Sequence, residues 1–61
     1  MTKEEALDIM MESINADNKE LGLKAGLNEE DLDAQIAQSQ PSLAFMMGNI
    51  YDKLKEAGAI A

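Results

Sequence analysis

Carboxylates are the residues of this chain most able to do chemistry, and they gather in two short clusters. Glu4 and Glu5 lie near the amino end, and residues 29–33 hold four acids. Such groups could bind a cation or act as a general acid and base. Nearly all fall in the first turns of expected helices, where negative charge complements the helix dipole. Asp31 and Asp33 also lack the Asp-x-Asp-x-Asp-Gly spacing of a calcium loop. We interpret both clusters as structural and predict no metal site.

Nucleophilic catalysis has little support in this sequence. There is no His and no Cys, so nucleophiles are limited to the hydroxyl groups of Thr2, Ser13, Ser39 and Ser42, with Lys or acids as the bases. Gly22 and Gly26 match neither a dinucleotide-binding loop nor a P-loop. We therefore expect a protein that is not an enzyme and uses no cofactor.

The composition predicts an all-α protein. The 61 residues include neither Val nor Trp, whereas Ala, Leu, Met, Glu and Lys are abundant. A chain this short buries only about 60% of its unfolded surface, so its core is marginal. Disulfides and Cys- or His-based zinc sites cannot compensate, which leaves helix packing and oligomerisation. We predict a single helical domain over residues 1–61 that assembles into a helical oligomer.

The first helix is expected over residues 3–21. Thr2 followed three residues later by Glu5 has the spacing of a capping box. Gly22 is expected to end the helix, because glycine readily takes the left-handed conformation just past a helix end. Residues 22–28 then form the connection.

The second helix is expected over residues 29–57. Asn28 can cap it, the acids that follow complement the dipole, and Leu27 can pack on Leu32 across the cap. Gly58 is expected to end it. The sequence thus predicts a small helical hairpin with a long carboxyl-terminal helix.

Two positions leave the number of helices open. The first helix could instead end at Asp17–Asn18, with a short piece over residues 19–25. Pro41 removes a backbone donor and disfavours helix at Gln40. It either kinks one long helix or starts a third helix after a break, and the second case gives a three-helix unit.

Two apolar seams follow the second helix, about a third to half a turn apart. The first predicts the core and consists of Leu32, Ile36, Leu43, Met46, Met47, Ile50, Leu54 and Ala57. The second consists mainly of small residues, which let another helix approach closely. We predict that this small-residue seam forms the oligomer interface through Ala34, Ala37, Pro41, Ala44, Phe45 and Gly48.

Polar and cationic residues suggest a possible ligand site between protomers. They supply hydrogen-bonding groups, one aromatic ring and positive charge for a small polar or anionic ligand. The candidates are Lys19, Lys24, Gln38, Asn49, Tyr51 and Lys53. The alternative is a solvated surface with Tyr51 at the edge of the core.

The net charge of −7 is unevenly distributed. Residues 1–20 hold two Lys against six acids, residues 21–39 one against four, and residues 40–61 two against two. An acidic chain without Arg does not suit direct nucleic-acid binding. No apolar stretch is long enough to span a membrane, and the absence of Cys fits a cytoplasmic protein.

The run from Asn49 to Ile60, NIYDKLKEAGAI, resembles the tails of small phage-encoded helical accessory proteins. This resemblance implies an accessory role, such as inhibiting a host enzyme or sequestering a host signal molecule. It assigns a role to no single residue.

Two functions follow as expectations. The first is a homo-oligomeric inhibitor or adaptor whose acidic first half meets a basic surface of a protein partner. The alternative is an oligomer that sequesters a small polar or anionic ligand, such as a nucleotide-type signal, between its protomers.

Overall fold

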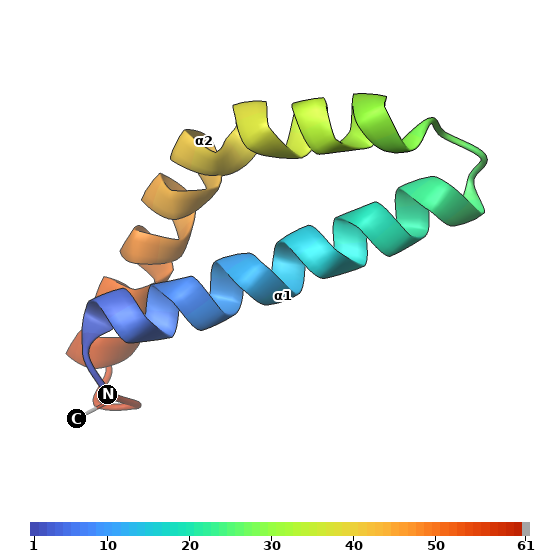
Figure 1. The fold of residues 1–61 in the computed structure, drawn as a ribbon. Helices are drawn as coiled ribbons and strands as arrows, with labels where there is room; N and C mark the ends of the chain where they lie inside the picture. Colours follow the sequence, from blue (N-terminus) through green and yellow to red (C-terminus); the bar gives the residue numbers. More distant parts are fainter. Residues whose placement is uncertain (61) are drawn as a thin grey trace.

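The computed structural model describes residues 1–60 and shows two helices in a hairpin (Figure 1). Helix α1 spans Lys3–Lys24 and helix α2 spans Glu29–Glu56. The two helices run in opposite directions, so the start of α1 lies beside the end of α2 (Figure 1). Residues 1–60 contain no strand, which confirms the all-α prediction. Within this range, neither helix is long and apolar enough to cross a membrane.

Both predicted helix starts are confirmed by their capping hydrogen bonds. The backbone N–H of Glu5 donates to Oγ1 of Thr2 at 3.1 Å, and the backbone N–H of Thr2 donates to Oε1 of Glu5 at 3.0 Å. At the second start, Oδ1 of Asn28 accepts from the backbone N–H of Glu30 at 2.9 Å and of Asp31 at 3.3 Å. These side chains satisfy N–H groups that have no partner within the helix.

The predicted end of the first helix at residue 21 is wrong, because α1 continues to Lys24. Gly22 lies inside the helix and is buried, and the left-handed residue is Gly26, with φ of 84°. Gly26 donates to the carbonyl of Leu23, and Leu27 donates to the carbonyl of Gly22, both at 3.0 Å. This is a Schellman motif, and it shortens the connection from the predicted seven residues to 25–28.

Helix α2 is a single helix that contains Pro41, so the chain is not divided at Ser39–Gln40. In Figure 1 the ribbon of α2 changes direction along its length. Near the proline, the carbonyl of Ile36 accepts hydrogen bonds from Oγ of Ser39 at 2.8 Å and Nε2 of Gln40 at 2.7 Å. Pro41 supplies no N–H to the carbonyl of Ala37, so these side-chain donors reinforce the preceding turn and do not replace the missing bond. The helix ends at Glu56, one residue before the predicted end, with Gly58 at φ of 80°.

An interhelical amide pair lies in the middle of the hairpin. Nδ2 of Asn15 donates to Oε1 of Gln40, and Nε2 of Gln40 donates to Oδ1 of Asn15, each at 2.9 Å. Both side chains are half-buried. The pair fixes which residues of α1 face which residues of α2.

The hydrophobic core is small for a folded protein of this length. The buried apolar residues among those described are Ala6, Leu32 and Tyr51, and none of these is completely buried. The Cα radius of gyration is 13.7 Å, whereas a compact chain of this length has about 10.5 Å. The accessible surface is 4572 Å², against about 3,900 Å² expected for a globular monomer of this mass. The hairpin is therefore elongated, and several large apolar side chains, Ile9, Phe45 and Met46 among them, remain exposed.

Candidate functional site

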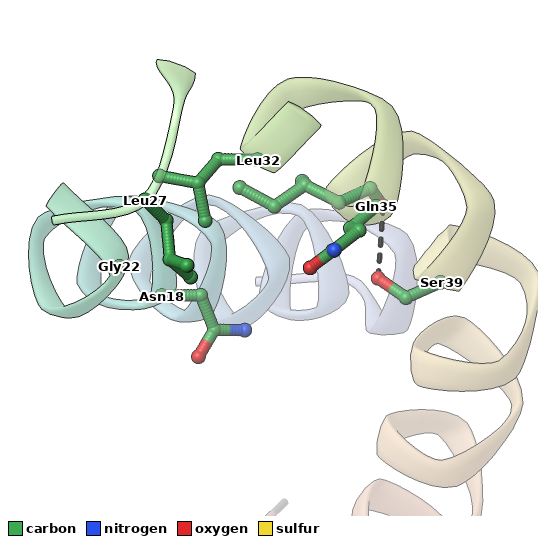
Figure 2. A pocket seen from close by; sticks show the side chains of 7 residues that line it. Asn18, Gly22, Leu27, Leu32, Gln35 and Ser39 are labelled. Carbon is green, nitrogen blue, oxygen red and sulfur yellow. Dashed lines mark hydrogen bonds between the residues drawn. The ribbon is translucent and has the colours of Figure 1, made fainter. Parts of the chain in front are cut away.

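A hollow of about 340 Å³ lies between the helices near the turn (Figure 2). Its lining residues are Asn18, Gly22, Leu27, Leu32, Gln35, Ile36 and Ser39. Figure 2 shows the polar ends of Asn18, Gln35 and Ser39 around one side, with Leu27 and Leu32 beside Gly22. This volume is at the lower end of the range for small-molecule sites. The lining side chains are apolar or neutral and polar, so they offer hydrogen bonds but no charge.

Gly22 brings the two helices close together at this hollow. A Cβ atom added to Gly22 would overlap Cδ2 of Leu32 and lie 2.8 Å from its Cδ1 and 3.1 Å from its Cγ. Leu32 is only 5% exposed because it occupies the space that a side chain at position 22 would take. Glycine is therefore required here for close approach, not for a left-handed backbone.

The two lysines predicted to bind a ligand are both engaged in ion pairs near the turn. Nζ of Lys19 lies 3.1 Å from Oε1 of Glu29 and 3.2 Å from Oδ1 of Asp33. Hydrogen bonds to Glu29 and then Asp33 raise the pKa of Lys19 above its ordinary value. Lys24 pairs with Glu20 on the same helix, at 3.1 Å. Neither lysine lines the hollow.

The remaining predicted ligand residues lie on α2. Gln38, Asn49 and Lys53 are exposed, whereas Tyr51 is buried. Nζ of Lys3 lies 6.0 Å from the centroid of the Tyr51 ring and 2.9 Å from Oδ1 of Asp52. Tyr51 therefore packs beside the first turn of α1, at the opposite end of the hairpin from Lys19. One chain alone does not bring the six residues together, and the site between protomers stays a prediction.

Most of the small-residue seam lies on the surface of α2. Ala34, Ala37, Pro41 and Ala44 are exposed, and Phe45 is 71% exposed. Gly48 is half-buried, and a Cβ added there would lie 3.9 Å from Cε of Lys3, an ordinary contact distance. Packing within one chain therefore does not require glycine at position 48. The predicted interface along this seam stays untested.

Part of the predicted core seam is also exposed, contrary to the prediction that all of it packs in the core. Ile36, Leu43 and Met47 are half-buried, but Met46 is 48% exposed, Ile50 45% and Leu54 39%. The width of the seam could have indicated this exposure in advance. Because Met46 and Met47 are adjacent in the sequence, the seam holds two rows of side chains. A single partner helix covers one of these rows, and the other faces outward.

Acidic side chains form a second exposed row, on α1. Glu4, Asp8 and Glu12 follow one another at intervals of four residues and therefore lie along one side of the helix. Within residues 1–60, none of the three forms an ion pair, unlike Glu20, Glu29, Asp33 and Asp52. Nor do any three His, Cys, Asp or Glu side chains of this range form a group that could hold a metal ion.

No protein family, curated protein or solved structure matches this chain.

Proposed function

We propose that this protein is a non-enzymatic, acidic helical binding module that acts as a homo-oligomer. It acts as an inhibitor or as an adaptor of a protein partner that presents a basic surface. The observation that supports this proposal best is the exposed row of Glu4, Asp8 and Glu12. An accessory role of the kind implied by the carboxyl-terminal resemblance fits such a module.

The acidic row has a cost that the hairpin does not offset. Like charges four residues apart on a helix destabilise it by roughly 0.2–0.5 kcal/mol per pair. Glu4 also complements the helix dipole, but Asp8 and Glu12 lie beyond the first turn, where that benefit ends. A basic surface on a partner would convert this repulsion into attraction. It would also speed the encounter, because complementary charge steers association.

The test is recovery of the tagged chain, with its bound proteins, from cells that express it. We expect a stoichiometric basic protein at about 50 mM salt and its release by about 500 mM, since salt screens exposed charges. The double variant Asp8→Asn/Glu12→Gln should lose this partner. The control Asp17→Asn/Glu56→Gln changes the net charge equally at exposed sites outside the row and should keep it. Equal retention by both variants would contradict the proposal.

A second candidate function is sequestration of a small ligand, and the hollow near the turn favours it. The neutral polar groups of Asn18, Gln35 and Ser39 suit an uncharged polar molecule more than an anion. Native mass spectrometry of the purified protein tests this directly. A retained small molecule that Gln35→Ala releases would support this candidate, and unliganded protein from every lysate would contradict it.

A further inference from the structure

The apolar row formed by Met46, Ile50 and Leu54 is only partly covered within the hairpin, with exposures of 48%, 45% and 39%. These residues are spaced by four, so they lie along one side of α2 beside the half-buried Leu43 and Met47. The exposed leucines near the turn do not form such a row. Leu21 and Leu23 lie about 160° apart around α1, and Leu27 lies outside both helices. Ile9 on α1 and Phe45 on α2 are exposed singly, whereas the three residues of the row follow one another along one side of α2.

The size of the uncovered surface fits a second folded chain. The hairpin exposes 4572 Å², about 700 Å² more than a globular monomer of its mass. Stable protein interfaces bury about 800 Å² from each partner. A second hairpin packed on this one would cover a surface of that size and complete a four-helix core.

The charge distribution indicates that this second chain is another copy of the protein. Two copies that each carry −7 repel one another wherever residues 1–39 meet, because this segment holds all of the net negative charge. Residues 40–61 hold two lysines and two acids, and Lys53 and Lys55 lie beside the apolar row. This neutral segment is where a like-charged copy can approach with the least repulsion. A basic partner would be drawn instead to the acidic row of α1.

We infer that a second copy of this chain packs on the row Met46, Ile50 and Leu54, with the two α2 helices antiparallel about a two-fold axis near Ile50. Contact between identical surfaces places the same residues on both sides. Ile50 then meets Ile50 of the other copy, and Met46 meets Leu54. This inference rests on the homo-oligomeric part of the proposed function, and it places the contact on this row and not on the small-residue seam.

Single lysine substitutions distinguish the two surfaces. We expect the natural chain to sediment as a dimer between about 1 and 100 μM, and Ile50→Lys to weaken dimerisation at least about 30-fold, as for an interface hot spot. Phe45→Lys, beside the small-residue seam, should leave the dimer unchanged. Circular dichroism at the same concentrations tests whether Ile50→Lys keeps its helices. If it unfolds, Ile50→Ala replaces it, with a smaller loss of affinity expected.

A cysteine variant tests the two-fold arrangement independently of stability. The chain has no Cys, so Ile50→Cys introduces a single thiol. Two residues that face each other across the axis at the contact can be bridged, since a disulfide needs Cα atoms roughly 4.4–6.8 Å apart. Mild oxidation should therefore convert Ile50→Cys to a covalent dimer, while Phe45→Cys should stay uncoupled.

Several results would overturn the inference. The first is a natural chain that is helical but monomeric at every concentration. The second is a dimer that Phe45→Lys dissociates and the substitution at Ile50 does not. The third is a dimer in which Phe45→Cys forms the disulfide faster than Ile50→Cys. Partner binding is a separate readout. A monomeric chain that still retains its basic partner refutes the dimer alone, whereas an Ile50-linked dimer without a partner refutes the binding role alone.

Discussion

The two ends of the hairpin hold the same pair of helices together in different ways. Near the turn, Gly22 lets α2 come close, and Leu32 occupies the space it leaves. At the open end, the large side chain of Tyr51 acts as a spacer: it is buried and faces Lys3 in the first turn of α1. Leu32 and Tyr51 are each only 5% exposed, so close contact and a bulky spacer bury their central residue equally well. Apolar side chains are exposed at both ends, with Leu21, Leu23 and Leu27 near the turn and Met46, Ile50 and Leu54 toward the open end, so neither way of joining the helices covers the apolar surface beside it.

Removing the spacer should have the largest effect on stability. Tyr51→Ala is expected to lower the free energy of unfolding by about 3 kcal/mol, because a ring that is 95% shielded from solvent is lost. Chemical denaturation at a fixed protomer concentration measures this. Phe45→Ala is the matched control, since this ring is 71% exposed, and we expect a change within about 0.5 kcal/mol. A large cost for Phe45→Ala would mean that the small-residue seam is buried in the assembled protein.

The contact between Gly22 and Leu32 predicts a reversal of sign. In the natural chain, Gly22→Ala should destabilise by about 1–2 kcal/mol, because overpacking outweighs the gain in helix propensity. In the Leu32→Ala background the new methyl group has room, and the same change should stabilise by about 0.5–1 kcal/mol. Leu32→Ala alone should cost about 2–3 kcal/mol. A double-mutant cycle measured by denaturation gives all of these values.

If the changes in unfolding free energy in this cycle were additive, α2 would move freely away from position 22. Gly26→Ala is a useful comparison, since a Cβ at Gly26 meets nothing within 4 Å. Any cost of that substitution arises from the backbone, because φ at Gly26 is 84°. The two glycines therefore separate steric contact from backbone conformation.

A smaller effect is expected midway between the two ends of the hairpin, at the Asn15–Gln40 pair. Asn15→Ala should cost about 1 kcal/mol, because the half-buried amide of Gln40 loses its partner. Replacing both residues with apolar side chains, as in Asn15→Leu/Gln40→Met, should cost less than the two single changes together. Thermal unfolding of the four variants measures this coupling. Equal and additive losses would mean that each amide bonds water in the folded protein.

The smallest expected effect is the pH dependence of the first cap. Hydrogen bonds from the backbone and side chain of Thr2 lower the pKa of Glu5 below its ordinary value. A lowered pKa in the folded state stabilises the protein above the unfolded pKa, and this stabilisation is lost as pH falls through the folded pKa. Glu5→Gln keeps a side-chain acceptor but cannot titrate, so its acid unfolding curve should be flatter over this range. Acid denaturation followed by circular dichroism tests the difference, and identical curves would contradict it.

The predictions that the structure confirms depend on local interactions. Thr2 and Glu5 are three residues apart, and Asn28 bonds the backbone two and three residues later, so each cap is encoded within one turn. Gly58 is likewise found at the left-handed position where the sequence places it. Such motifs can be recognised without knowledge of the fold.

The errors concern contacts between the helices. Gly22 and Gly26 have equal freedom to end a helix, and only the position of Leu32 distinguishes them. Tyr51 is buried beside Lys3, which lies forty-eight residues earlier in the sequence. Similarly, the hydrophobic pattern places Met46 and Ile50 on the core side of α2 but cannot show how many rows one neighbour covers. These outcomes depend on how two distant surfaces fit together.

The ion pair between Lys3 and Asp52, at 2.9 Å, also shows that the hairpin begins and ends at the same side. A tandem gene duplication could therefore join two hairpins through a short linker without reversing either one. Linking would turn the meeting of two units into an intramolecular event, with an effective concentration on the order of millimolar for a short flexible linker. Geometry of this kind gives a small hairpin a direct evolutionary and engineering route to a single-chain, up-down-up-down bundle.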